Sequence, residues 1–248
     1  MATLAKSMAR FRENVEKSTD LVNTTSLGTK MNYLSPKIVI CGTDTDVGKT
    51  IVSSFLVQGL NASYWKPIQS GLKNNGDKGT VSKLLSLPNE RLIPETYKFE
   101  AAVSPHWAAE KENRMVNPSE LKLPITQRTL IIETAGGLMV PLNRAFLQIQ
   151  QLKAWKLPVI LVARTGLGTL NHTLLSIEAL KNRSIPLMGL ILNGHKHEDN
   201  PRTLEEFSGV CVIAQLPRFD KVSAKQLSEE WEKQKLGAVF QKLMRQYC

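Results

Sequence analysis

The sequence predicts an α/β fold, in which a mostly parallel sheet carries helices on both faces. Short apolar and β-branched runs alternate with segments of helical periodicity from residue 37 onward. Consecutive parallel strands need crossover connections, and helices usually supply them. Hydrophobic residues make up 42% of the 248 positions, and no internal repeat or low-complexity linker divides the chain. We therefore expect one large domain.

Six short apolar segments are predicted as strands: 37–42, 63–68, 129–134, 157–163, 186–194 and 209–217. The first, KIVICG, has the β-branched content that is typical of a strand buried on both faces. Pro67 is expected to end the second strand, because proline cannot donate a hydrogen bond to the ladder. The AGG sequence after Thr134 is expected to break the third strand.

Four segments are predicted as helices: 48–60, 105–112, 171–182 and 223–246. Ser104 followed by Pro105 predicts a helix N-cap with proline at the first helical position. The last helix closes the chain. Residues 70–80, SGLKNNGDKGT, are expected to form a loop.

Residues 1–35 differ in composition from the rest of the chain, because they lack aliphatic runs and are rich in Ser, Thr, Asn and Lys. We expect a disordered N-terminal extension there, followed by a domain over 36–248. A transit peptide is the alternative interpretation, since residues 1–12 could form a short basic amphipathic helix, although acidic residues follow closely.

The composition excludes some classes of protein. No run approaches the ~20 apolar residues that a membrane span needs, so we expect no membrane insertion. The net charge of +10 is spread along the chain and suits nucleotides, other anions or nucleic acids alike. No aromatic-interleaved basic patch or helix-turn-helix signature supports nucleic-acid binding. Three widely spaced cysteines without a CxxC fit a reducing compartment, so we expect a cytoplasmic protein.

Ligands of parallel α/β sheets bind at the carboxyl ends of the strands. The chemistry should therefore lie just after residues 42, 66, 133, 163, 193 and 217. This expectation comes from the strand pattern alone.

A phosphate-binding loop is predicted over 42–50. The segment GTDTDVGKT follows the first strand and opens the first helix, which is the context that such a loop requires. Its N–H groups can surround a phosphate, Lys49 can reach the β- and γ-phosphates, and the Thr50 hydroxyl can bind Mg²⁺. Five residues separate Gly42 from Gly48, where four are usual. We expect a P-loop NTPase-like domain.

Three further charged residues are candidates for the site. Glu133 ends an apolar run, where an acid would face the phosphate loop as a metal ligand or water holder, and Gly136 and Gly137 would let a ligand approach the backbone. Lys66 ends the second strand and could balance developing negative charge, although a surface lysine is an equal alternative. Asp77 could supply a second metal oxygen, but aspartates are common in loops.

Six segments occur in one order along the chain: GTDTDVGKT, YWKPIQSG, VSPHWAAE, IIETAGGLMVPL, LPVILVARTGLGTLNHTLLSIEAL and GLILNG. Together they resemble the dethiobiotin synthetases over roughly 37–220. The combination of GTDTxVGKT, KPxxSG and LGTxNH is highly specific, since few other P-loop proteins share even two of the three.

The resemblance implies a ligase of biotin biosynthesis that uses ATP and Mg²⁺. In this family an amine of 7,8-diaminononanoate takes up CO₂ to give a carbamate. ATP phosphorylates the carbamate to a carbamic–phosphoric anhydride, and the second amine closes the ring. The products are dethiobiotin, ADP and phosphate. The resemblance also implies a homodimer with active sites near the subunit interface.

The resemblance further implies roles for individual residues. Lys66 and Lys49 would be catalytic, with Lys66 holding the carbamate, and the Mg²⁺ ligands would be Thr50, Asp77 and Glu133. The implied nucleotide-binding residues are Asp46, Val47, Gly48, Lys49, Thr50, Ile51, Asp77, Glu133, Thr134, Ala135, Gly136, Asn193, Gly194 and Pro217. The implied substrate-binding residues are Thr45, Lys66, Ser70, Leu167, Gly168 and Asn171.

Two features of the sequence depart from the pattern of the dethiobiotin synthetases, and two other families are alternative interpretations. Thr134 stands where glycine is common, and residues 195–203 match poorly. The main alternative is a P-loop switch ATPase of the partitioning type, but those proteins carry an early lysine in a KGGxGKT pattern that this loop lacks. An amidating ligase of cobalamin synthesis would need a glutaminase domain with a nucleophilic cysteine, for which this chain has no context.

Overall fold

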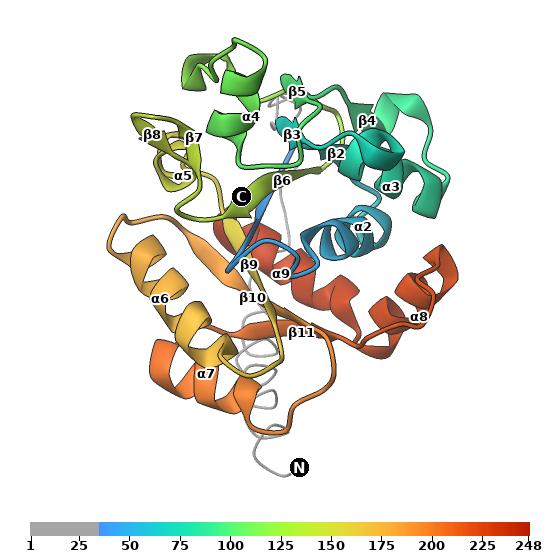
Figure 1. Cartoon of the computed structure of the whole chain (residues 1–248). Coiled ribbons are helices and arrows are strands. Elements are labelled where there is room, and N and C mark those ends of the chain that lie inside the picture. The colour runs from blue at the N-terminus through green and yellow to red at the C-terminus, as the bar shows by residue number, and fades with distance from the viewer. Residues whose placement is uncertain (1–34) are drawn as a thin grey trace, which may run out of the picture. The chain divides into compact units, whose positions relative to one another are not determined.

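The computed structural model of the protein describes residues 35–248 (Figure 1). The extension expected over 1–35 lies, apart from Ser35, outside the described residues. The domain boundary at residue 36 therefore stays a prediction.

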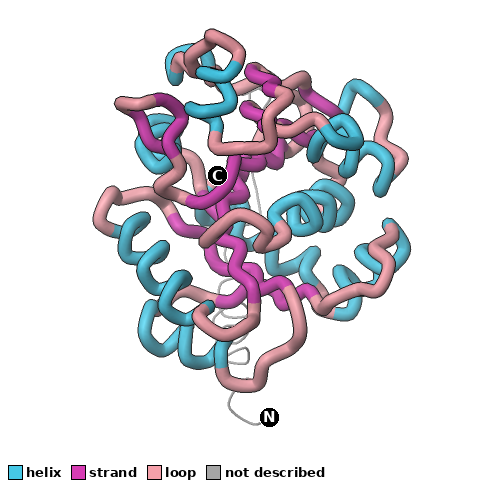
Figure 2. Tube along the Cα trace, in the orientation of Figure 1, coloured by secondary structure: helices cyan, strands magenta, loops and turns pink. Residues whose placement is uncertain are grey.

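Strands and helices alternate along most of the described chain (Figure 2). The strands are β1 (Lys37–Gly42), β2 (Ser63–Trp65), β3 (Ile68–Ser70), β4 (Leu92–Ile93), β5 (Tyr97–Phe99), β6 (Leu130–Gly137), β7 (Pro141–Asn143), β8 (Phe146–Leu147), β9 (Val159–Arg164), β10 (Leu187–Asn193) and β11 (Val212–Leu216). The α-helices are α2 (Lys49–Gly59), α3 (Gly76–Leu85), α4 (Pro105–Lys111), α5 (Gln148–Trp155), α6 (Thr169–Lys181), α7 (Asn200–Ser208), α8 (Ala224–Lys233) and α9 (Leu236–Tyr247). Short 3₁₀ turns lie at Lys73–Asn75, Asn89–Arg91 and Pro118–Glu120.

The main sheet has seven strands in the order β11-β10-β9-β1-β6-β2-β4. Every pairing within it is parallel, which confirms the predicted fold class. The parallel pair β3-β5 and the antiparallel pair β7-β8 form two small additional sheets. Because all the main strands run in one direction, their carboxyl ends share one edge, which positions the site.

Side chains of β1 alternate between two apolar layers, one on each face of the sheet. Ile38 and Ile40 pack in one layer with residues of α2, α8 and α9. Val39 and Cys41 pack in the other with residues of α5, α6 and α7. Both faces of the sheet are thus covered by helices, as predicted. A smaller apolar cluster joins β3, β5 and α4.

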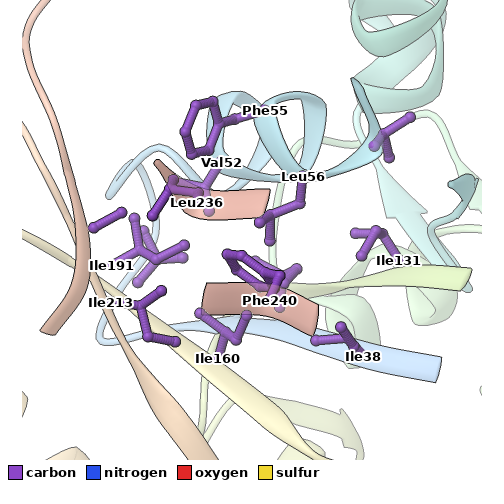
Figure 3. Packing of buried hydrophobic residues seen from close by; sticks show 14 of the residues in the cluster. Ile38, Val52, Phe55, Leu56, Ile131, Ile160, Ile191, Ile213, Leu236 and Phe240 are labelled. Carbon is purple, nitrogen blue, oxygen red and sulfur yellow. The ribbon is translucent and has the colours of Figure 1, made fainter. Parts of the chain in front are cut away.

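In Figure 3, Phe55 of α2 and Phe240 of α9 gather with Ile38 and Ile160 of the sheet. Trp231 of α8 stacks on Phe240 with ring centroids 5.3 Å apart and meets Phe55 edge-on at the same distance. These three aromatic rings therefore join α2, α8 and α9 on this face of the sheet.

Replacing Phe240 with alanine should lower the free energy of unfolding by about 3–5 kcal/mol, because a fully buried ring would leave a cavity among close-packed neighbours. Urea unfolding followed by circular dichroism measures the change. Phe207→Ala is the control, since Phe207 is 78% exposed and its loss should change stability by less than about 0.5 kcal/mol. Equal effects of the two substitutions would contradict the packing described here.

The prediction of a loop over 70–80 is wrong from Gly76 onward, where α3 begins. Asn74 and Asn75 adopt left-handed conformations, with φ of 55° and 59°, and turn the chain into the helix. Asparagine tolerates this conformation, so residues typical of a loop here lead into a helix. Asp77 consequently lies in the first turn of a helix.

The AGG sequence does not break the third predicted strand. β6 runs through it to Gly137, with a bulge that changes the register from Ile40 opposite Glu133 to Gly42 opposite Gly137. Gly136 has a φ of 60°, and a Cβ there would lie 2.7 Å from Cγ2 of Val140. Glycine at this position allows a bulge where an end of the strand was expected.

Two other predicted elements are divided. The segment 63–68 ends as β2 at Trp65, and after Pro67 the chain continues in β3 of a separate small sheet. The C-terminal segment 223–246 forms two helices, because Lys235 has a φ of 54° and turns the chain between α8 and α9. This turn brings the apolar faces of α8 and α9 together.

Some local features were missed or differ from expectation. Ser104 occupies the N-cap position of α4 as predicted, but its side chain makes no cap hydrogen bond. The helices α5 and α7 and the short strands β4, β5, β7 and β8 were not predicted. The short strands are two or three residues long, too short for a periodic pattern to identify.

Candidate active site

A cleft of about 700 Å³ lies at the carboxyl ends of β1, β2 and β6. Twelve of the predicted site residues line it: Thr45, Asp46, Gly48, Lys49, Thr50, Ile51, Lys66, Ser70, Asp77, Glu133, Ala135 and Gly136. They come from segments up to 91 positions apart in the chain. The strand-end expectation therefore located the cleft correctly for these three strands.

The phosphate loop joins β1 to α2 through two residues of positive φ, Asp46 at 55° and Gly48 at 91°. Gly48 is the N-cap of α2, so the free N–H groups of the first helical turn face the cleft. Lys49 Nζ donates to the carbonyl of Asp44 at 2.9 Å, across the mouth of its own loop. The loop thus provides N–H groups and an ammonium group at one end of the cleft.

Asn193, at the end of β10, is hydrogen-bonded to the phosphate loop. Its Nδ2 donates to the carbonyl of Val47 at 3.0 Å. A Cβ at Gly48 would lie only 2.0 Å from the same Nδ2 atom. Glycine at position 48 is therefore required both by the positive φ and by the close approach of Asn193.

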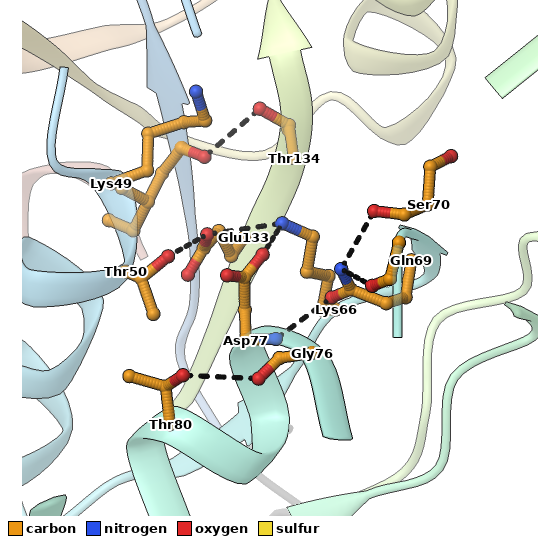
Figure 4. A network of polar contacts seen from close by, with 12 residues as sticks. Lys49, Thr50, Lys66, Gln69, Ser70, Gly76, Asp77, Thr80, Glu133 and Thr134 are labelled. Carbon is orange, nitrogen blue, oxygen red and sulfur yellow. Dashed lines mark hydrogen bonds and ion pairs between the residues drawn. The ribbon is translucent and has the colours of Figure 1, made fainter. Parts of the chain in front are cut away.

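Glu133 lies at the centre of a polar network and is only 1% exposed (Figure 4). Its Oε1 accepts from Thr50 Oγ1 at 2.9 Å and from Lys66 Nζ at 3.3 Å. Its Oε2 accepts from the hydroxyl of Tyr64 at 2.9 Å. Lys66 also pairs with Asp77 Oδ2. The network brings together both predicted acids, the predicted lysine and the loop threonine.

Strand register explains why these residues meet. Glu133 of β6 lies opposite Ile40 of β1 on one side. On the other side Trp65 of β2 lies opposite Ile132, so Lys66, the next residue, comes beside Glu133. The acid and the lysine were predicted separately, and the register makes them a pair.

Burial and nearby charges set the ionisation of the three groups around Glu133. Burial would lower the pKa of Lys66, but the carboxylates of Glu133 and Asp77 outweigh it, and the pKa is raised above its ordinary value. Burial lowers the pKa of Lys49, and attraction to Glu133 does not offset it. Burial and Glu133 together raise the pKa of Tyr64, so its hydroxyl keeps its proton. Lys66 is thus stabilised as an ammonium ion, whereas the ammonium form of Lys49 would be stabilised by a bound anion.

Gln69 fixes the start of α3 beside the cleft. Its Nε2 donates to the carbonyls of Ser70 at 3.1 Å and Gly71 at 2.9 Å. Its Oε1 accepts the N–H of Asp77 at 3.0 Å. The side chain of Gln69 therefore connects the end of β3 to the helical turn that carries Asp77.

Ser70 has a hydroxyl group with spare hydrogen-bonding capacity. The residue lines the cleft, and its Oγ is enclosed without a hydrogen-bond partner among residues 35–248. Enclosed polar atoms are rarely left unpaired in native proteins. This hydroxyl is therefore a candidate contact for a polar ligand.

The residues present fit a magnesium ion that binds together with a nucleotide. Thr50, Asp77 and Glu133 supply oxygen atoms, which are the ligands that Mg²⁺ prefers, and Mg²⁺ commonly uses one or two carboxylates with phosphates and water. Within residues 35–248 no group of three or more His, Cys, Asp or Glu could hold a metal by itself. The remaining ligands would therefore come from the nucleotide and from water.

Eight predicted residues lie outside the cleft lining. Val47 and Thr134 are buried, and Thr134 Oγ1 donates to the carbonyl of Ile40 at 3.2 Å. The others follow strands on the far side of β1, namely Leu167, Gly168 and Asn171 at the start of α6, Asn193 and Gly194 after β10, and Pro217 after β11. Leu167, Gly168 and Asn171 are exposed in the single chain.

Sequence reasoning missed several residues of the site. Tyr64 and Gln69 hold Glu133 and Asp77, and further lining comes from Ala102, Val103, Ser104, Pro105 and Val140. A signal for Tyr64 was available, because it lies two positions before Lys66 and therefore shares its face of the extended chain. Gln69 had no such signal, because its partner belongs to a helix that was not predicted.

Among the described residues, no helix is long and apolar enough to cross a membrane. Cys41, Cys211 and Cys248 are free. Burial raises the pKa of the Cys41 thiol to about 12, so this cysteine beneath the phosphate loop is a packing residue.

Comparisons with known sequences agree on one family. A family model described as an AAA domain matches residues 36–226. A protein named ATP-dependent dethiobiotin synthetase BioD from Rhodopseudomonas palustris is 43% identical over 191 residues, which are 77% of this chain and 90% of the relative. A protein of the same name from Rhizorhabdus wittichii is 44% identical, over 75% of this chain and 90% of the relative. The biotin biosynthesis bifunctional protein BioCD of Bordetella avium is 46% identical over 79% of this chain, which spans 42% of that longer protein.

Solved structures share the fold at low sequence identity. The septum site-determining protein MinD of Pyrococcus horikoshii, complexed with Mg-ADP, has a TM-score of 0.50 and 16% identity, over 86% of this chain and 95% of that one. The pNOB8 ParA structure, bound to nonspecific DNA, has a TM-score of 0.53 and 12% identity, over 86% and 98%. These likenesses confirm a P-loop NTPase-like fold and carry nothing about activity.

Proposed function

The chain belongs to the family of ATP-dependent dethiobiotin synthetases, and from this premise we propose how its cleft carries out the ligase reaction of biotin biosynthesis. In that reaction 7,8-diaminononanoate, CO₂ and ATP give dethiobiotin, ADP and phosphate. The observation that carries the proposal is that Lys49, Lys66 and Ser70 line one cleft, with Glu133 and Asp77 against Lys66. The ParA-like alternative retains only a likeness of fold.

Lys49 and Lys66 hold the two anions of the reaction. We assign the triphosphate to the loop residues Asp46–Ile51, with Lys49 at the β- and γ-phosphates. We assign the carbamate to Lys66, whose ammonium group stabilises negative charge as the γ-phosphoryl group is transferred. The second amine then attacks the carbonyl carbon of the anhydride, the C–O bond to phosphate breaks, and the ring closes.

The remaining residues bind and orient the two substrates. Thr45 and the free hydroxyl of Ser70 contact the diamine, and the backbone of Thr134–Gly136 lies near the phosphates. Asn193, Gly194 and Pro217 contact the adenine base of the nucleotide. Leu167, Gly168 and Asn171 contact the diamine that is bound to a second subunit, so the enzyme acts as a homodimer. The exposure of these three residues in the single chain supports this assignment.

Thr50, Asp77 and Glu133 are the residues that would hold Mg²⁺. The ion, when bound with ATP, would neutralise phosphate charge and thereby favour attack by the carbamate. We place the enzyme in the cytoplasm, because three free cysteines suit a reducing compartment. Nucleic acid is not among the proposed partners.

A product assay tests the proposed function. The full chain is incubated with diaminononanoate, bicarbonate and MgATP, and dethiobiotin and ADP are quantified by mass spectrometry. Equal amounts of the two products are expected, and each omission of a substrate should abolish dethiobiotin. ADP without dethiobiotin would assign the cleft to another acceptor or to a switch ATPase. Neither product from folded protein would refute the proposal.

A further inference from the structure

Glu133 has its two carboxylate oxygens in different surroundings. Oε1 accepts from Thr50 and Lys66, both of which line the cleft, whereas Oε2 accepts from the hydroxyl of Tyr64. Tyr64 is completely buried, and it does not line the cleft. One oxygen is thus directed to the site, and the other is held in the core.

The sheet register makes this arrangement possible. Tyr64 lies opposite Ile131, and Lys66 follows one position beyond the pair of Trp65 with Ile132. Tyr64 and Lys66 are two positions apart and share one face of the chain. The β2 strand and the residue that follows it therefore provide a neutral donor for one oxygen of Glu133 and a cation for the other.

A carboxylate without a donor on Oε2 would have another arrangement available. It could turn both oxygens toward the ammonium group of Lys66, which lies 3.3 Å from Oε1. With both oxygens directed to Lys66, the carboxylate would be a poorer ligand for a second cation, because neither oxygen would be left to face that cation. The Tyr64 hydroxyl opposes this rotation, since it would lose a hydrogen bond to a charged group inside the core.

We propose that Tyr64 is a positioning residue, which holds Oε2 of Glu133 so that Oε1 alone is presented beside Thr50 to the magnesium ion that accompanies the nucleotide. The proposal deepens the proposed function and rests on it for the identity of the cation. It assigns Tyr64 no contact with substrate. Loss of the Tyr64 hydroxyl should therefore change how nucleotide binding depends on the Mg²⁺ concentration. Nucleotide binding in the absence of metal should stay the same.

Tyr64→Phe removes a single oxygen atom and tests the proposal with Tyr97→Phe as the matched control. Tyr97 is also buried, and its hydroxyl donates to Oε2 of Glu120 at 2.5 Å, away from the cleft. ADP binding is measured by calorimetry in EDTA and over a series of Mg²⁺ concentrations. In Tyr64→Phe the half-saturating Mg²⁺ concentration should rise about tenfold, because a hydrogen bond to a charged group is lost. Tyr97→Phe should match the original protein, and ADP affinity in EDTA should be the same in all three.

A second comparison separates positioning from a general loss of stability. In a Glu133→Gln background, Tyr64→Phe should cause no further change in the Mg²⁺ dependence, because the group that it positions is already altered. Thermal unfolding of Tyr64→Phe and Tyr97→Phe is compared to check that both proteins are folded. If Tyr64→Phe has the same Mg²⁺ curve as Tyr97→Phe, or weakens ADP binding equally in EDTA, the proposal is wrong. Since ADP binding is measured without the diamine, failure of the product assay would be recognised separately.

Discussion

Replacing Lys66 with alanine should lower the rate of dethiobiotin formation by about 10²- to 10³-fold, which is typical for the loss of one group that stabilises developing negative charge. ADP should still bind within about threefold of its original affinity, because the phosphate loop does not use Lys66 for its own structure. Mass spectrometry of the product and calorimetry with ADP measure the two effects. Near-normal turnover would show that Lys66 does not hold the carbamate.

A matched control is needed, because Lys66→Ala also leaves Glu133 without its cation in the core. Breaking a buried ion pair from one side costs about 3–5 kcal/mol of stability. Lys78→Ala breaks a comparable pair, since Lys78 Nζ lies 2.7 Å from Oε2 of Glu95, whose side chain is 2% exposed. We expect Lys78→Ala to lower the unfolding temperature and to leave turnover nearly unchanged. Equal losses of turnover in the two variants would attribute the effect to folding.

Replacing Lys49 with alanine should produce a different pattern, with loss of both nucleotide affinity and turnover. Removing a charged hydrogen-bond donor from the phosphates should weaken ATP binding by at least about tenfold and slow product formation by a further 10²-fold or so. Titration with ATP and the product assay measure these changes. Lys83→Ala is the control for loss of a positive charge, because Lys83 is exposed on α3. Unchanged ATP affinity in Lys49→Ala would contradict the assigned role.

The two lysines should also differ in their effect on stability. The carboxylates of Glu133 and Asp77 raise the pKa of Lys66 above its ordinary value of 10.5, so its charge stabilises the folded state. That stabilisation is complete below pH 10.5 and is lost as the pH rises through the folded-state pKa. Burial instead lowers the pKa of Lys49, so its charge is held at a cost. At neutral pH Lys66→Ala should therefore lower the unfolding temperature, whereas Lys49→Ala should not.

The fold class and the edge of the sheet that holds the cleft were predictable from local patterns. Apolar runs such as KIVICG reveal strands, and the GKT sequence after the first of them reveals the start of a helix that binds phosphate. The rule that ligands bind at the carboxyl ends of the strands then predicts that Lys66 and Glu133 lie at the edge that holds the cleft. The prediction of a loop around Asp77 was wrong, because the helix start there depends on asparagines in left-handed conformations and on a hydrogen bond from the N–H of Asp77 to the side-chain Oε1 of Gln69.

Local patterns in the sequence are sufficient to predict the phosphate loop, the direction of the strands and the charged groups available for chemistry, since each depends on residues close together in the chain. Which of these groups meet follows from the arrangement of the strands and helices in space. Tyr64 and Glu133 are 69 positions apart, and Asn193 and Val47 are 146 positions apart, yet each pair shares a hydrogen bond. Such contacts depend on strand order, register and the β6 bulge, which are set by the packing of the whole core and not by spacing within any one segment.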